Sequence, residues 1–142
     1  MVEMKKSLEI SSIDNAHRII IQSFGPMYPD EKEFYLRDLQ SNLLIISSSN
    51  IQLEYKNPIF LKSELESFVK QLDLLVQRKV KKANLYADEE EINLVVQRKS
   101  EELKVTFEFK QNNFVNEKWG YTIFFSVSEE SIKKIITETK IP

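Results

Sequence analysis

The chain contains no cysteine, one histidine, two glycines and four prolines among its 142 residues. Without cysteine it has no disulfide, no thiolate nucleophile and no cysteine-ligated zinc or iron–sulfur site. One histidine and no cysteine leave mainly hard oxygen ligands for a metal ion, which argues against a transition-metal site. The low glycine and proline content argues against glycine-rich phosphate loops, long linkers and low-complexity character.

Neither charge sign dominates, since 20 basic and 22 acidic residues give a net charge of −2. The basic excess that is typical of nucleic-acid-binding proteins is therefore missing. The chain has no apolar run of about 18 residues, so we expect no membrane-spanning helix. Residues 1–7 do not lead into the apolar region of a signal peptide, and the lack of cysteine fits a reducing compartment. The expected location is the cytoplasm.

The length and the alternation of apolar and polar residues predict one domain over residues 1–142, rich in β-strand. Turn residues at 14–16 indicate a hairpin over 8–24, and Gly25-Pro26 would end it before a surface loop. Further strands are expected over 36–47, 51–55, 83–87, 92–97, 103–109 and 119–127. Short polar segments join the last of these strands, which favours an antiparallel meander.

The clearest helix is expected over residues 63–78, where apolar residues recur at helical spacing. Ser63 and Glu66 match a capping box, in which each side chain accepts from an unpaired backbone N–H of the first turn. The basic residues of segment 78–82 would complement the negative end of the helix dipole. They could also contact nucleic acid, but the nearby acidic run 88–91 would repel phosphate.

A second helix is expected to follow Ser128, with Glu129 and Glu130 in its first turn. Strands and helices do not alternate as βαβ units, and no internal repeat is visible in the sequence. The expected fold class is α+β: a largely antiparallel sheet of about seven strands with a long central helix and a C-terminal helix packed on it.

No residue pattern marks a catalytic centre or a cofactor site. His17 lies beside a predicted turn and is expected to be a turn or strand-edge residue. The run Asp88, Glu89, Glu90 and Glu91 lacks the alternate spacing and the glycine of a calcium loop. It is either a solvated hairpin tip or an acidic patch that faces a basic partner surface.

Aromatic residues in expected loops are the other candidates for partner binding. They are Tyr28, Phe34, Phe114 and Trp119, in or beside the segments 25–36 and 111–119. Tyrosine and tryptophan often anchor protein interfaces, although loop aromatics also fold back over the end of a core.

The order of the expected elements resembles the WapI-type immunity proteins of bacteria. The similar stretches are Leu43-Leu44-Ile45-Ile46, Ile51-Gln52-Leu53-Glu54-Tyr55, the helix from Leu61 to Leu72, Ala83-Asn84-Leu85, the strands 103–109 and 119–127, and Ser128-Glu129-Glu130-Ser131-Ile132. They cover roughly residues 7–140, with Asn42 at a position where the family often has tryptophan.

The resemblance implies a cytoplasmic, non-enzymatic protein that binds the C-terminal domain of a toxin and blocks it. It carries over no catalytic, metal-binding or cofactor residue. A small-molecule-binding or regulatory α+β domain is the main alternative, and a small metal-dependent hydrolase or nuclease is a third possibility.

Overall fold

The computed structural model describes residues 7–26, 28, 30–34, 38–56, 60–86, 92–112 and 118–139. Within these ranges the chain forms two four-stranded antiparallel sheets and two helices, which confirms the predicted α+β class. The first sheet has the order β1 (Ser7–Ser11), β2 (His17–Pro26), β3 (Gln40–Ser48) and β4 (Ile51–Lys56). The second has the order β5 (Lys82–Tyr86), β6 (Ile92–Lys99), β7 (Glu102–Asn112) and β8 (Lys118–Val127). Helix α2 (Lys62–Val76) connects the sheets, and α3 (Glu129–Glu138) follows β8.

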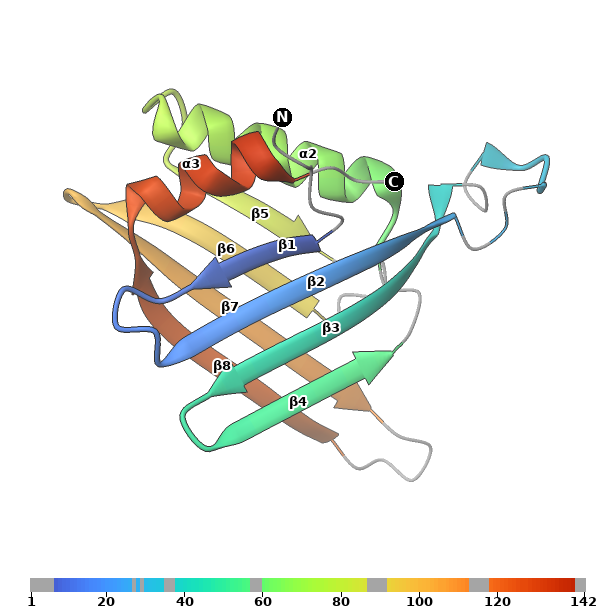
Figure 1. Ribbon diagram of the computed structural model, residues 1–142, viewed down its shortest axis with the longest axis horizontal. Helices are drawn as coiled ribbons and strands as arrows, with labels where there is room; N and C mark the ends of the chain where they lie inside the picture. The colour runs from blue at the N-terminus through green and yellow to red at the C-terminus, as the bar shows by residue number, and fades with distance from the viewer. Residues whose placement is uncertain are drawn as a thin grey trace.

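The expectation of one sheet of about seven strands, with a central helix, is wrong. The strands divide into two sheets because α2 intervenes between β4 and β5, which do not pair. In each sheet the strands direct their apolar side chains to one face, and the apolar faces of the two sheets form a common core. Figure 1 shows the two sheets lying face to face. The helices lie side by side along one flank of this sandwich, where α2 packs on β5 and α3 packs on β1.

One core joins both sheets and both helices. Its largest fully buried side chains include Leu8, Ile10, Ile19, Ile21, Leu44 and Ile46 from the first sheet, Phe107 and Phe109 from the second, and Leu65, Phe68 and Leu72 from α2. Helix α3 adds Ile132 and Ile135. Burial of these apolar side chains is the main favourable contribution to the free energy of folding.

The order of four strands followed by one helix occurs twice, although no repeat is visible in the sequence. The first unit is β1 to β4 with α2, and the second is β5 to β8 with α3. Each helix packs on the first strand of the other unit: α2 packs on β5, and α3 packs on β1.

Three turns lie at one end of the sandwich, the turn end, and the β2–β3 connection lies at the other, the loop end. Residues 12–16, 49–50 and 100–101 form the turns, at the left of Figure 1. At the turn end the Ile13 N–H donates to the Ser126 carbonyl at 3.0 Å. At the loop end the rings of Tyr55 and Phe109 meet edge to face, with centroids 5.1 Å apart. These contacts show that corresponding ends of the two sheets lie together.

The N-cap of α2 is Leu61, two residues before the predicted N-cap, Ser63. The Leu61 N–H donates to the Glu64 carboxylate at 2.7 Å. The N–H and hydroxyl of Ser63 both donate to Asp38, at 3.1 and 2.5 Å, so Ser63 ties the first turn to the segment before β3. Glu66 instead lies 3.9 Å from Lys62 as an exposed ion pair. Ser63 and Glu66 therefore do not form the predicted capping box, and Glu64 takes the role predicted for Glu66.

The basic segment 78–82 does not lie in the last turn of α2. The helix ends at Val76, and the chain reverses through Arg78, which has a φ of 61°. Arg78 then pairs with Glu101 of the β6–β7 turn at 2.9 Å, and Lys82 begins β5. The start of α3 agrees with the prediction, because the Ser128 hydroxyl accepts from the Ser131 N–H at 3.1 Å.

Candidate protein-binding surface

The structure describes only some of the predicted partner-binding side chains. Tyr28 and Phe34 lie in the β2–β3 connection and are exposed. The residues Asp88, Glu89, Glu90, Glu91 and Phe114 lie outside the described residues, as does the side chain of Trp119 in β8. The strands that flank these connections, β5 with β6 and β7 with β8, meet the loop end.

Several exposed aromatic side chains lie toward the loop end. The large apolar side chains that are exposed in the described part of the chain are Ile13, Phe24, Tyr28, Phe34, Ile51, Tyr86 and Phe124. Four of these seven, all aromatic, lie at the loop end: Phe24, Tyr28, Phe34 and Tyr86. The β2–β3 connection that carries two of them projects beyond the sheets at the right of Figure 1. Aromatic residues are enriched in protein–protein interfaces, and such a group is their usual surface signature.

Phe24 and Tyr86 were not predicted. Phe24 continues the regular alternation of β2, in which Ile21 and Ser23 face inward, and it is 64% exposed on the outer face. The register of β2 with β3 shifts between Ser23 and Pro26, where Gly25 has a left-handed φ of 102° that suits glycine. Tyr86 could have been found, because Ala83 and Leu85 alternate inward and leave it facing outward.

Buried polar contacts hold the base of this surface. The Ser23 hydroxyl donates to the Gln40 side-chain oxygen at 2.7 Å. The Phe60 N–H donates to the Asn42 side-chain oxygen at 2.9 Å, and the Gln40 N–H donates to the Phe60 carbonyl at 3.0 Å. These bonds join β2, β3 and the segment before α2 inside the core. The exposed aromatics therefore stand on an ordered framework, which limits the entropy lost on binding.

The described residues of the β2–β3 connection carry an acidic excess. Asp30, Glu31 and Glu33 are exposed there, with Lys32 as the one basic residue between Tyr28 and Phe34 in the described positions. This charge sits directly beside the two aromatic side chains. Such a surface is complementary to a basic partner face.

His17 occupies a strand-end position at the turn end, away from these aromatics. Its Nδ1 lies 2.6 Å from the Ser48 hydroxyl oxygen, and its ring stacks on Phe125 with centroids 5.7 Å apart. The nearby Asp14 carboxylate accepts instead from the Ser12 hydroxyl at 2.6 Å and the Ala16 N–H at 3.1 Å. These two bonds lower the pKa of Asp14, the Ser12 bond having the larger effect.

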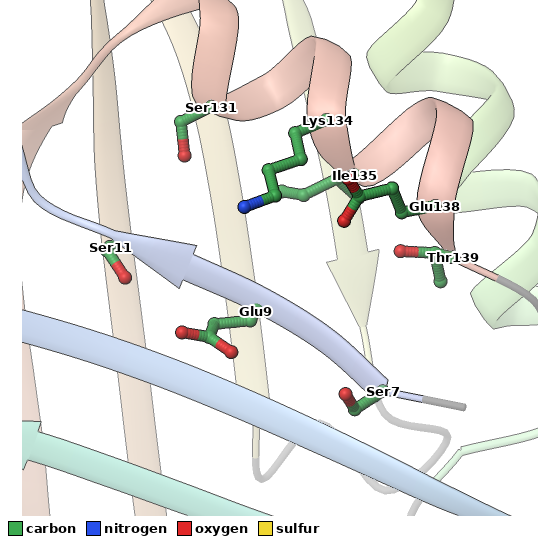
Figure 2. Close-up of a pocket in the computed structure, with 8 residues that line it drawn as sticks. All are labelled: Ser7, Glu9, Ser11, Ser131, Lys134, Ile135, Glu138 and Thr139. Atoms are coloured by element: carbon green, nitrogen blue, oxygen red, sulfur yellow. The ribbon is translucent and has the colours of Figure 1, made fainter. Parts of the chain in front are cut away.

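A small hollow separates β1 from α3 (Figure 2). It has a volume of about 110 Å³ and is lined by Ser7, Glu9, Ser11, Ser131, Lys134, Ile135, Glu138 and Thr139. Ligand sites usually measure about 300–1,000 Å³ and are mostly apolar. In this hollow Glu9 is already engaged by Arg18, whose guanidinium lies 2.6 Å away. The size and polarity of the hollow suit water better than a small-molecule ligand.

A larger groove of about 440 Å³ runs between α2 and α3. Its lining includes the apolar side chains Val69 and Ile136 and the charged side chains Lys62, Glu66, Lys70 and Asp73. It is an open surface groove with both charge signs along it, and it differs from the closed apolar pocket that would favour the small-molecule alternative.

Two further searches concern the described residues alone. No group of three or more histidine, aspartate or glutamate side chains among them is arranged to hold a metal ion. No helix within the described ranges has the length and apolar character needed to cross a membrane.

Comparison with known proteins completes the description of the surface. No family model, curated protein or solved structure matches this chain. The resemblance to WapI-type immunity proteins therefore rests on element order in the sequence alone.

Proposed function

We propose that this chain is a non-enzymatic, cytoplasmic immunity protein that binds the C-terminal domain of a cognate bacterial toxin and blocks it by occlusion. One observation carries the proposal: the β2–β3 connection at the loop end presents two exposed aromatic side chains, Tyr28 and Phe34, together with exposed acidic residues. The resemblance in element order supplies the class of partner.

The physical basis is surface complementarity. Exposed aromatics bury a large apolar area at a small cost in side-chain entropy, so a few of them can dominate the free energy of binding. The exposed acidic residues Asp30, Glu31 and Glu33 of the β2–β3 connection would speed encounter with a basic toxin surface. Inhibition needs no reactive group on the inhibitor, because covering the toxin's active site is sufficient.

The test is co-expression with the toxin domain encoded beside this chain, scoring cell survival and complex formation together. The chain should protect the cells and co-purify with the domain. The double variant Tyr28→Ala with Phe34→Ala should weaken the complex by roughly 30-fold or more, as expected for interface hot spots.

Ile13→Ala is the matched control, because Ile13 is 65% exposed and Phe34 is 68% exposed, at opposite ends of the sandwich. This variant should bind as tightly as the parent. Survival of the cells without physical association would refute the binding mechanism. Equal loss in the control would show that the loop end is not the binding surface.

A further inference from the structure

The two flanks of the sandwich differ in how their sheet edges are covered. On the helix flank α3 lies along β1 and α2 lies along β5 (Figure 1). The Gln71 side chain also bonds to the backbone of β5, accepting from the Asn84 N–H at 3.0 Å. On the opposite flank the edge strands are β4 and β8, with no helix beside them in the part of the chain that the structure describes.

The hydrogen-bond register shows which backbone groups of β4 point outward. The Ser49 N–H donates to the Ala16 carbonyl at 3.0 Å, beside the pair His17 and Ser48. Because bonded and non-bonded pairs alternate in an antiparallel ladder, Ser48 directs its backbone groups toward its β4 partner Ile51. The same alternation points the backbone groups of Gln52 and Glu54 away from the sheet. Neither residue makes another backbone bond within the described ranges.

The edge of β8 is less open than that of β4. Ile13 of the β1–β2 turn already bonds to the Ser126 carbonyl at this edge. Among the described residues, none bonds to the outer edge of β4 in this way. Strand β4 also has no proline, and its register with β3 shows no bulge, so it lacks two of the usual devices that protect an edge strand.

The side chains of β4 divide cleanly between its two faces. Ile51, Leu53 and Tyr55 face the core side, where Ile51 is 59% exposed and the other two are half-buried. Gln52 and Glu54 lie exposed on the outer face, and the Gln52 amide donates to the Glu54 carboxylate at 3.2 Å. Strand β4 thus presents an incompletely covered apolar row, an open backbone edge and an amide–carboxylate pair.

We infer that this edge pairs with β4 of a second copy of the chain, antiparallel about a two-fold axis at Leu53. This register places Gln52 opposite Glu54 of the second copy, twice, and each such pair exchanges two backbone hydrogen bonds. The apolar residues then face one another, with Leu53 opposite Leu53 and Ile51 opposite Tyr55. In this register every polar side chain of residues 51–55 meets a polar side chain of the second copy, and every apolar side chain meets an apolar one.

A neighbouring register is disfavoured by charge. Shifting the axis from Leu53 to Glu54 places Glu54 opposite Glu54 of the second copy. Like charges directly opposed across strands are destabilising. A strand pair this short buries less than the roughly 800 Å² per partner that is typical of a stable complex. The dimer is therefore weak and forms with rising concentration. It leaves the loop end open, so it is independent of the proposed function.

The test is sedimentation equilibrium of the full chain over a range of concentrations, with three charge variants. Gln52→Glu sets two pairs of like charges across the axis and should weaken the dimer about tenfold, and Gln52→Lys should tighten it several-fold. Adding Glu54→Lys to Gln52→Glu restores opposite charges and should restore the dimer. Circular dichroism confirms that each variant is folded.

Thr122→Glu is the matched control, because Thr122 is exposed on the other open edge strand, β8. It should leave the dimer unchanged. A chain that stays monomeric to about 1 mM, which corresponds to only about 4 kcal/mol of binding free energy, would overturn the inference. So would a dimer that Gln52→Glu leaves intact, or one that Thr122→Glu disrupts, since either result places the interface elsewhere.

Discussion

At the scale of single residues, the β1–β2 turn is held by one carboxylate. Asp14 accepts from the Ser12 hydroxyl and the Ala16 N–H, and Asn15 takes a left-handed φ of 60° between them. Both bonds favour the ionised carboxyl, so the pKa of Asp14 lies below its usual range in the folded chain. Folding therefore gains stability from Asp14 above the pKa it has when unfolded. That gain is lost as the pH falls through the lower, folded value.

Ser12→Ala should raise the pKa of Asp14 toward its ordinary value, because the largest cause of the shift is removed. The measurement is an NMR titration of the Asp14 carboxyl carbon. Ser11→Ala should leave the titration unchanged, since no bond joins Ser11 to Asp14 in the described structure. An unmoved pKa in Ser12→Ala would mean that the hydroxyl does not hold the carboxylate in solution.

At the scale of elements, strands and helices were largely predictable because alternation and helical spacing are local properties. The strand expected over 103–109 lies within β7, and the helix expected after Ser128 is α3. The caps of α2 were not predictable, because Ser63 bonds to Asp38, a residue far away in the sequence. For the candidate surface, the alternation of Ile21 and Ser23 could have predicted that Phe24 faces outward, whereas the sequence left open whether Tyr28 and Phe34 are exposed or fold over the core.

Gln71 protects the outer edge of β5 in place of a neighbouring strand. Its side-chain oxygen accepts from the Asn84 N–H, and its amide lies 3.4 Å from the Asn84 carbonyl. Gln71→Ala should lower the free energy of unfolding by about 1 kcal/mol, because the edge loses both partners. Urea denaturation measures this change. Lys70→Ala, an exposed neighbour on the same helix, should change stability far less.

At the scale of the whole molecule, the sequence pattern could not show whether the strands form one sheet or two. The alternation in each strand says that one face is buried, but it does not say which surface covers that face. Whether β4 and β5 pair depends on the path of α2, and α2 turns the chain toward the second sheet instead of over the first. The packing of Tyr55 on Phe109 and of His17 on Phe125 joins residues that are far apart in the sequence.

Neither unit of four strands and a helix should fold alone, because each sheet needs the other to cover its apolar face. Fragments 1–79 and 80–142 should each show little structure by circular dichroism. The intact chain should unfold in one cooperative transition by heat and by urea. Two separate transitions, or a stable isolated fragment, would show that the units are autonomous.

The exposure of the β2–β3 connection has a consequence for how such a molecule can change over time. In the described part of this connection, Tyr28 and residues 30–34 are exposed and add no side chain to the core. Insertions and substitutions there can alter recognition while the framework stays intact. One scaffold can in this way present different binding surfaces, with a new specificity requiring changes in a single connection.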